Sequence, residues 1–295
     1  MKATTKTVAP QALGALLEST FVGHLPGVMY TSVGSLEVLI SDITNDSKQV
    51  RHGSMYCCVV GDHTDGHDFA QDALNAGASA LLVERKLPID CAQVIVSDAR
   101  RAMGEMASAL YDHPSKRMRV VGITGTNGKT TTAHLLGAIF RQQGLNTEVF
   151  GTLSGARTTP ESCDLQRNLW HAAEAGVRAV VMEVTSHALV LQRIVGTQFD
   201  AVVFLNLSPE HLDFHKTLEQ YFAAKASLFD KRFTNLGIVN GDDVHGQLLL
   251  DAADIETLSF GLSDVDKIEV TPQSHSYFWR NNNVHVAVGG KFNVL

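Results

Sequence analysis

The chain lacks an excess of basic residues, because its 24 Lys and Arg are outnumbered by 31 Asp and Glu and the formal net charge is -7. Binding to a nucleic-acid backbone normally requires a basic excess or a clear basic patch. We therefore expect no nucleic-acid partner. An anionic substrate has to be held locally, by a few cationic side chains.

Long apolar runs are also missing. No stretch approaches the ~18 apolar residues of a membrane span. The N-terminus, MKATTKTVAPQALGALLESTF, has neither the continuous apolar core nor the small-residue cleavage site of a signal peptide. We expect a cytoplasmic protein that does not bind membranes.

Cysteine is scarce, and none of the four residues forms the C-x-x-C pair of redox or zinc motifs. Cys57 and Cys58 are adjacent in an apolar run, whereas Cys91 and Cys163 are isolated. We interpret all four as structural thiols in a reducing compartment.

The composition of the chain is typical of a globular protein, with 44% hydrophobic and 19% charged residues among 295. At roughly 100 to 200 residues per domain, two domains are expected. The segment from His113 to Arg117 interrupts the apolar pattern with a proline and charges. We therefore predict domains at residues 1–113 and 114–295.

The most informative stretch is GITGTNGKTTT, from Gly122 to Thr132. It lies between an apolar run at residues 119–121 and a helical pattern that starts near Ala133, an order typical of strand, glycine loop and helix. Backbone N–H groups of such a loop close around phosphate oxygens, while Lys129 reaches the β- and γ-phosphates and the Thr130 hydroxyl ligates Mg²⁺. This pattern predicts ATP or GTP binding.

The loop departs from the generic spacing, because Ile123 stands where a glycine is usual, six places before Lys129. A plain glycine-rich turn is the alternative interpretation. Gly-Lys-Thr-Thr between a strand and an amphipathic helix favours the phosphate loop.

Short apolar runs alternate with helical patterns on both sides of this loop. Such runs, separated by helices, indicate a parallel sheet covered on both faces. The end of the chain, HSYFWR-NNN-VHVAVGG, alternates apolar and polar residues around an asparagine turn and predicts an antiparallel hairpin. The fold class is therefore α/β: a small N-terminal α/β domain, then a central domain with a phosphate loop, a mostly parallel sheet and a terminal antiparallel hairpin.

The boundaries of the expected elements follow from these patterns and their glycine and N-cap signals. They are a strand in MYCCVVG from Ser54, a helix near 69–76, strands at 80–83 and 94–96, a helix after Asp98, a loop helix ended by Gly144, a strand at 147–150, a helix near 165–175, strands at 179–184 and 201–205, a helix near 218–229 and a strand at 237–239.

Two polar residues, Glu183 and His211, then stand out as candidates for chemistry. Glu183 ends an apolar strand, and open α/β sheets place ligand chemistry at the carboxyl ends of their strands, so we expect it to bind Mg²⁺ rather than to face solvent. His211 follows the next strand, in the ligand-dense loop SPEHLDFH. His215, in the same loop, has no claim beyond proximity.

Lys225 is the least expected residue, because it falls on the apolar stripe of the helix LEQYFAAKASLF. A snorkelling side chain is the alternative interpretation. Burial would instead lower the pKa of the lysine and free a neutral amine. Such an amine takes up CO₂ as a carbamate, which would make Lys225 an oxygen ligand for a metal.

Several motifs, taken in order, resemble those of the Mur ligases. They are GTNGKTT, GTL with ARTTPE, MEVTSHAL, NLSPEHLDFH, YFAAKASLF, VNGDD and GGKFNV, and the likeness runs from about Asn45 to the last residue. Within the family it is strongest to the branch that adds the third residue of the peptidoglycan stem peptide to UDP-N-acetylmuramoyl-L-alanyl-D-glutamate.

The resemblance implies roles for particular residues. ATP would be bound by the loop residues Gly125, Thr126, Asn127, Gly128, Lys129, Thr130 and Thr131, with Asn240 and Asp243 near the nucleotide. Mg²⁺ would be held by Thr130, Glu183, His211 and a carbamoylated Lys225. The substrate contacts would be Ser47, Asp62, His63, Thr64, Thr158, Thr159, Thr185 and Arg193, with the 62–64 loop at the uridine end.

The implied reaction transfers the ATP γ-phosphate to the D-glutamyl carboxylate, and the amine of the incoming amino acid attacks the resulting acyl phosphate. This chain departs from many relatives, with Thr185 for Ser, Leu191 for Gln, Glu210 for Asp and Lys48 for Arg. Leu191 removes a polar contact to the substrate. We expect a monomer that acts on the UDP-N-acetylmuramoyl-dipeptide and an amino acid.

In the family the FNV segment opens a helix, and a third domain that selects the amino acid follows. The chain stops at this point, so we expect a fragment that binds substrates without completing turnover. Two alternatives stay open. One is a Mur-like ligase of another pathway, of the folylpolyglutamate or cyanophycin type, although the N-terminal segment from Asn45 disfavours it. The other is a nucleotide-binding module without catalysis.

Overall fold

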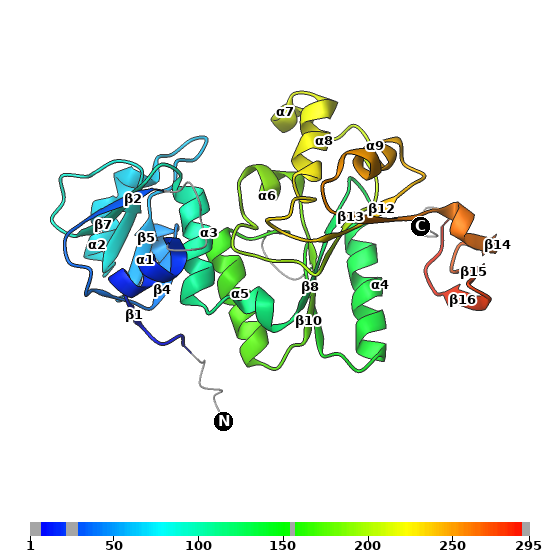
Figure 1. Ribbon diagram of the computed structural model, residues 1–295, viewed down its shortest axis with the longest axis horizontal. Coiled ribbons are helices and arrows are strands. Elements are labelled where there is room, and N and C mark those ends of the chain that lie inside the picture. Colours follow the sequence, from blue (N-terminus) through cyan, green and yellow to red (C-terminus); the bar gives the residue numbers. More distant parts are fainter. Residues whose placement is uncertain (1–6, 22–28, 154–156, 291–295) are drawn as a thin grey trace. The chain divides into compact units, whose positions relative to one another are not determined.

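The computed structural model describes residues 7–21, 29–153 and 157–290. The predicted FNV segment, Phe292 to Val294, and residues 154–156 of the GTL–ARTTPE region lie outside the described residues. The chain forms two compact units (Figure 1), and each consists of three chain segments. The first unit comprises Met1–Arg117, Pro160–Gly176 and Leu191–Thr197; the second comprises Met118–Thr159, Val177–Val190 and Gln198–Leu295.

The first unit is built on a five-stranded sheet in the order β2-β7-β6-β5-β4, in which only β2 runs antiparallel. A further pair, β1 with β3, is antiparallel. The strands are β1 (Gln11–Ala12), β2 (Tyr30–Val33), β3 (Leu39–Ile40), β4 (Asp42–Thr44), β5 (Ser54–Cys57), β6 (Ala80–Val83) and β7 (Ala92–Val96). The α-helices are α1 (Leu13–Phe21), α2 (Ala70–Asn75), α3 (Ala99–Leu110) and α5 (Ser162–Glu174), and short 3-10 turns are η1 (Ser47–Gln49), η2 (Gly66–Phe69) and η3 (Pro114–Arg117).

The core of this unit is apolar, and one of its clusters includes two of the cysteines. Cys57 and Cys163 are buried together with Leu16, Leu82 and Met106. Burial raises the pKa of both thiols. They are therefore free, protonated core residues. This agrees with the structural role predicted from the absence of a C-x-x-C pair.

The second unit carries a six-stranded sheet, all parallel, in the order β13-β12-β11-β8-β10-β9. Its strands are β8 (Arg119–Thr124), β9 (Thr147–Phe150), β10 (Ala179–Glu183), β11 (Ala201–Phe204), β12 (Leu236–Asn240) and β13 (Glu256–Phe260). Its helices are α4 (Lys129–Gln142), α6 (Ser186–Val190), α7 (Leu212–His215), α8 (Leu218–Ala226) and α9 (Val244–Ala252), with the 3-10 turn η4 (Leu262–Asp264). The predicted parallel sheet is confirmed.

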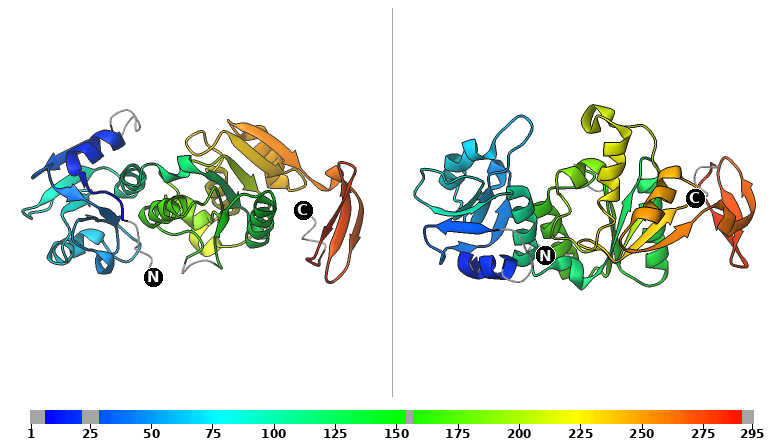
Figure 2. Two further views of the ribbon diagram at one scale, coloured as in Figure 1. Left: turned by 90° about the horizontal axis from the view of Figure 1, so that it is seen from below. Right: turned by 45° about the horizontal axis from the view of Figure 1, so that its top comes forward.

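A small antiparallel sheet follows at the end of the second unit (Figure 2). It consists of β14 (Val265–Val270), β15 (His275–Trp279) and β16 (Asn282–Val286). Trp279 pairs with Asn282 across a two-residue turn in which Arg280 and Asn281 both have positive φ. Such a turn matches the twist of a hairpin, and asparagine tolerates it well. The predicted hairpin is confirmed, and β14 adds a third strand.

Two predicted boundaries are wrong by three residues: α5 begins at Ser162 rather than near Leu165, and α8 ends at Ala226 rather than near Phe229. The amides of Leu228 and Phe229 bond to carbonyls only three residues back, so the last turn tightens. The ring of Phe229 packs directly over Gly237 of β12, where a Cβ would lie 2.7 Å away. Contact with the sheet therefore ends this helix early.

Helix α5 belongs to the first unit, although it follows the phosphate loop in sequence. It lies beside α3 (Figure 1). The predicted domains, residues 1–113 and 114–295, stay a prediction. Among the described residues no helix combines the length and the apolar character of a membrane span.

Candidate active site

The carboxyl ends of three neighbouring strands meet at one edge of the second sheet. In the register of the sheet, Ile123 of β8 lies beside Glu183 of β10 and beside Val203 of β11. The glycine loop follows β8 directly, Glu183 is the last residue of β10, and Asn206 follows β11. This edge is where open α/β sheets bind ligands.

The loop has a glycine wherever its backbone turns sharply. Gly125 and Gly128 have φ of 155° and 86°, and a Cβ on Gly125 would lie 2.9 Å from Leu205. The Asn206 side chain fixes the loop by binding both backbone polar groups of Asn127. It accepts from the backbone amide at 2.9 Å and donates to the backbone carbonyl at 3.2 Å. The first residue of α4 is Lys129, so the helix N-terminus points its unbonded N–H groups at the loop, as a phosphate site requires.

Two ammonium groups converge on this loop. Lys129 Nζ donates to the carbonyls of Gly125 and Thr126, at 2.8 and 2.7 Å. Lys225 Nζ donates to the same Gly125 carbonyl at 2.7 Å. Positive charge is therefore gathered where a triphosphate would lie.

Lys225 is buried rather than snorkelling, because only 1% of it is exposed. Desolvation, and then the charge of Lys129, lower its pKa to about 7. The face of the Tyr221 ring lies 4.5 Å from its ammonium and supplies part of the lost hydration. Burial also lowers the pKa of Lys129.

Glu183 is the buried acid of the site, with 1% exposure. One carboxylate oxygen accepts from the Thr130 hydroxyl at 2.9 Å and the other from the Thr152 amide at 2.9 Å. Gly151 allows this approach, since a Cβ there would overlap the carboxylate. The oxygens of Thr130 and Glu183 are the hard donors that Mg²⁺ prefers, so the site fits that ion. The described residues include no group of three or more His, Cys, Asp or Glu arranged to hold a metal.

His211 lies at the margin of this group. Its side chain is 46% exposed, its backbone is left-handed at φ 56°, and Glu210 is 3.8 Å away. Its ring meets the Tyr221 ring edge-on at 6.1 Å, and the Tyr221 hydroxyl lies 3.3 Å from that of Thr126. The structure thus joins Thr130 to Glu183 and Lys225 to the loop directly, while His211 approaches them through Tyr221.

Asn240 and Asp243 support the neighbouring loop. The Asn240 amide donates to the Leu205 carbonyl at 2.8 Å. Asp243 accepts from the Leu207 amide at 3.1 Å and caps α9. Their predicted nearness to the nucleotide stays a prediction.

Three predicted substrate residues, Thr158, Thr159 and Thr185, also lie in the second unit. Buried Thr159 donates to the Glu183 backbone carbonyl at 3.0 Å and accepts from the Thr185 amide at 3.3 Å. Thr158 lies 3.1 Å from Thr152, hydroxyl to hydroxyl. All three are therefore linked to Glu183.

The remaining predicted substrate residues belong to the first unit. Ser47 begins η1, and Asp62, His63 and Thr64 form an exposed loop closed by a bond from the Gly61 amide to the Thr64 carbonyl. Arg193 contacts Glu161 at 2.9 Å. Their substrate roles stay predictions.

Sequence reasoning missed Thr152 and Tyr221. Thr152 carries no motif beyond its place after a glycine, and Tyr221 has the spacing of an ordinary core residue. His215, which had no claim, is buried and bonds the Ser186 hydroxyl at 2.9 Å, so it packs α7 against α6.

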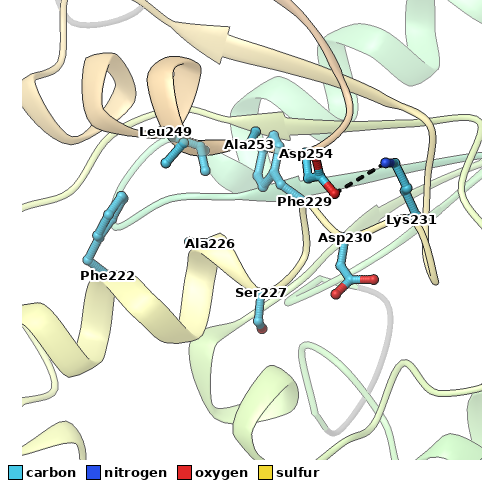
Figure 3. Close-up of a pocket in the computed structure, with 10 residues that line it drawn as sticks. Phe222, Ala226, Ser227, Phe229, Asp230, Lys231, Leu249, Ala253 and Asp254 are labelled. Atoms are coloured by element: carbon cyan, nitrogen blue, oxygen red, sulfur yellow. Dashed lines mark hydrogen bonds and ion pairs between the residues drawn. The ribbon is translucent and has the colours of Figure 1, made fainter.

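A separate pocket of about 350 Å³ lies between α8 and α9 (Figure 3). Phe222, Phe229 and Leu249 form its apolar wall, and the Lys231–Asp254 ion pair lies at its rim. No predicted site residue lines it, so it is not the phosphate site.

A parallel sheet with a phosphate loop at its carboxyl edge, and a buried acid beside that loop, define an α/β protein of the phosphate-loop class. Residues 123–295, more than half of the chain, match the Mur ligase middle domain, and residues 39–114 match the Mur ligase family catalytic domain. The chain belongs to the Mur ligase family.

Several similar proteins carry the name UDP-N-acetylmuramoyl-L-alanyl-D-glutamate--2,6-diaminopimelate ligase. The one from Aquifex aeolicus is 40% identical over 79% of this chain and 50% of its own length. That from Geobacter metallireducens is 41% identical over 78% of this chain and 48% of its own. The chain therefore spans about half the length of the curated relatives it matches.

Solved structures agree on the fold. A structure of a ligase of that name superimposes with a TM-score of 0.76 at 27% identity, covering 88% of this chain and 58% of that one. MurF from Acinetobacter baumannii superimposes with a TM-score of 0.70 at 23% identity, covering 98% and 63%.

Proposed function

We propose that this protein acts in peptidoglycan precursor synthesis as an ATP-dependent, amide-forming ligase of the MurE type. Its substrates are UDP-N-acetylmuramoyl-L-alanyl-D-glutamate and the third amino acid of the stem peptide, meso-diaminopimelate or L-lysine. The names of the similar proteins favour diaminopimelate. The observation that carries the proposal is the meeting of Lys129 and Lys225 at the Gly125 carbonyl, beside the Thr130–Glu183 contact.

The reaction first moves the γ-phosphoryl group of ATP to a D-glutamyl carboxylate oxygen and releases ADP. The amine of the incoming amino acid then attacks the acyl carbon, loses a proton and displaces phosphate, which leaves an amide. Two anions must approach each other in the first step, so Lys129 contributes by screening them and by fixing the phosphates. Mg²⁺ held by Thr130 and Glu183 would supply further neutralisation of phosphate charge.

Lys225 carries a finer proposal. Its amine, with a pKa of about 7, is largely neutral slightly above neutral pH. A neutral amine and CO₂ form a carbamate and release one proton. The carbamate would turn a cation into an oxygen donor and, with His211, extend the metal site. Carbon-13 NMR in labelled bicarbonate should show one carbamate signal that the Lys225→Met variant lacks.

Calorimetry tests the function with three ligands: UDP-N-acetylmuramoyl-L-alanyl-D-glutamate, the compound without D-glutamate, and Mg-ATP. We expect the chain to bind ATP and to prefer the dipeptide form. ATP binding without binding of either UDP compound would overturn the pathway and favour a ligase such as the folylpolyglutamate or cyanophycin type. Dipeptide binding with no carbamate and no dependence on Mg²⁺ would favour a non-catalytic module.

A further inference from the structure

The chain that follows strand β11 lies directly against the phosphate loop over residues 205–208. The Thr126 amide donates to the Asn206 carbonyl at 2.9 Å, and the Ser208 amide donates to the Thr126 hydroxyl at 3.0 Å. A Cβ on Gly125 would lie only 3.3 Å from the Asn206 nitrogen. The loop is therefore held along its length by this one short segment of the second unit.

The Asn206 side chain makes the contact that no strand pairing provides. Its carbonyl oxygen accepts from the Asn127 amide at 2.9 Å, and its amide group donates to the Asn127 carbonyl at 3.2 Å. A neighbouring β-strand would offer the same combination of one acceptor and one donor. Strand β8 is that neighbour as far as Thr124, whose carbonyl accepts from the Leu205 amide at 3.0 Å. Beyond this point β8 turns into the loop, and the Asn206 side chain continues the pairing.

The segment 205–208 is fixed on its other side as well. The Asn240 side chain donates to the Leu205 carbonyl at 2.8 Å, and Asp243 accepts from the Leu207 amide at 3.1 Å. The two leucines are 6% and 7% exposed, and Asn240 is 7% exposed. Since these contacts come from strand β12 and the start of α9, the backbone at the middle of the segment is firmly placed.

A count of the loop amides shows what this arrangement leaves for a ligand. Each backbone amide carries one proton, so an amide that donates to Asn206 is occupied. The amides of Thr126 and Asn127 are both occupied in this way. In α4 the first bond within the helix runs from the Thr132 amide to the carbonyl four residues earlier, at 2.9 Å. The amides of residues 128–131 precede it, and these are the donors that a helix N-terminus offers to an anion.

We propose that Asn206 is a positioning residue of the phosphate loop, which turns the amides of Thr126 and Asn127 away from the nucleotide and leaves those of residues 128–131 for the phosphates. The inference rests on the proposed function, since it assigns the groups of the same site that hold ATP. Asn206 does not touch the nucleotide. Because it holds both peptide groups that flank Asn127, it fixes the entry of the chain into α4 and so the direction of the amides that follow.

Calorimetry with Mg-ATP on the full chain gives the first test. We expect Asn206→Ala to weaken Mg-ATP binding about tenfold, or about 1.4 kcal/mol, because the amides of residues 128–131 are no longer held in one direction. The matched control is Asn283→Ala, which changes an exposed asparagine of β16 in the same unit. The control should change the affinity less than about twofold.

Amide hydrogen exchange, followed by NMR, separates this role from a general effect on folding. In the unmodified chain without ligand, the Thr126 and Asn127 amides should already be protected, and Mg-ATP should add protection only at residues 128–131. Asn206→Ala should lose the protection of the Asn127 amide. Asn206→Asp should keep it, because its carboxylate still accepts from that amide.

Three results would overturn the inference. They are free exchange of the Asn127 amide in the unmodified chain, protection of that amide only after Mg-ATP is added, and an Mg-ATP affinity of Asn206→Ala equal to that of the control. The first result needs no variant, so a variant that does not fold leaves the inference open to refutation. If the unmodified chain does not bind Mg-ATP, the proposed function fails instead.

Discussion

The two units treat their partly or fully buried cations in opposite ways. In the first unit Arg167 binds Asp42 at 2.8 Å and Asp164 at 2.7 Å, and contact with Tyr111 and with these acids outweighs its burial and raises its pKa. In the second unit Lys129 and Lys225 are bonded to backbone carbonyls, and burial lowers the pKa of both. The paired cation stabilises the fold, whereas Lys129 is placed for a ligand that brings negative charge and Lys225 is kept as an amine of low pKa.

Removing the loop lysine should therefore affect binding far more than folding. We expect Lys129→Ala to weaken Mg-ATP binding on the order of 100-fold, since charged hydrogen bonds to phosphate are lost. The free energy of unfolding without ligand should change by less than about 0.5 kcal/mol. Calorimetry and chemical denaturation measure the two quantities. Lys231→Ala, at an exposed ion pair, is the control. Unchanged ATP affinity in Lys129→Ala would contradict the claim that Lys129 is placed for an anionic ligand.

Breaking the paired cation should do the reverse. Asp42→Asn removes the negative charge that pairs with Arg167. It also weakens the acceptor of the Tyr111 hydroxyl, which lies 2.7 Å from the Asp42 carboxylate. We expect a loss of about 2 kcal/mol in the free energy of unfolding, with ATP affinity unchanged. Asp254→Asn, whose side chain is exposed, should cost nothing measurable in the same denaturation experiment. Equal stability of Asp42→Asn and the parent would contradict this assignment.

The pH dependence of stability sharpens the comparison. Burial lowers the pKa of Lys225 from 10.5 to about 7. Between these values the unfolded chain binds more protons than the folded chain, so the free energy of unfolding rises with pH, by up to roughly 1.4 kcal/mol per unit. Denaturation in CO₂-free buffer from about pH 7 to pH 9 measures this slope. The slope should be smaller in Lys225→Met, because the contribution of Lys225 is lost. An identical slope in the variant would show that Lys225 is not buried as a neutral amine.

The smallest expected effect concerns the acid of the site. Glu183→Gln keeps an acceptor for the Thr130 hydroxyl but removes a metal-binding charge. We expect the enhancement of ATP binding by Mg²⁺ to fall severalfold, on the order of 1 kcal/mol. Titrations with and without Mg²⁺ give this ratio, and exposed Glu256→Gln is the reference. A full Mg²⁺ enhancement in Glu183→Gln would exclude Glu183 as a ligand.

Much of the second unit could be predicted because its information is local. The phosphate loop depends on glycines whose φ values other residues avoid, and the strands around it are short apolar runs. The hairpin follows from alternation and an asparagine turn. The helix at Lys225 was predicted three residues too long, because its end depends on Phe229 packing over Gly237.

The sequence by itself determined the phosphate loop, the parallel sheet behind it and the presence of Glu183 at a strand end, since each depends on neighbouring residues and on the periodicity of strands and helices. Only the tertiary structure decided that α5 and residues 191–197 join the first unit, that Glu161 faces Arg193, and that Lys129 and Lys225 share one carbonyl. These contacts link residues 32 to 100 positions apart or depend on how helices pack, and no local pattern encodes the distance between such side chains.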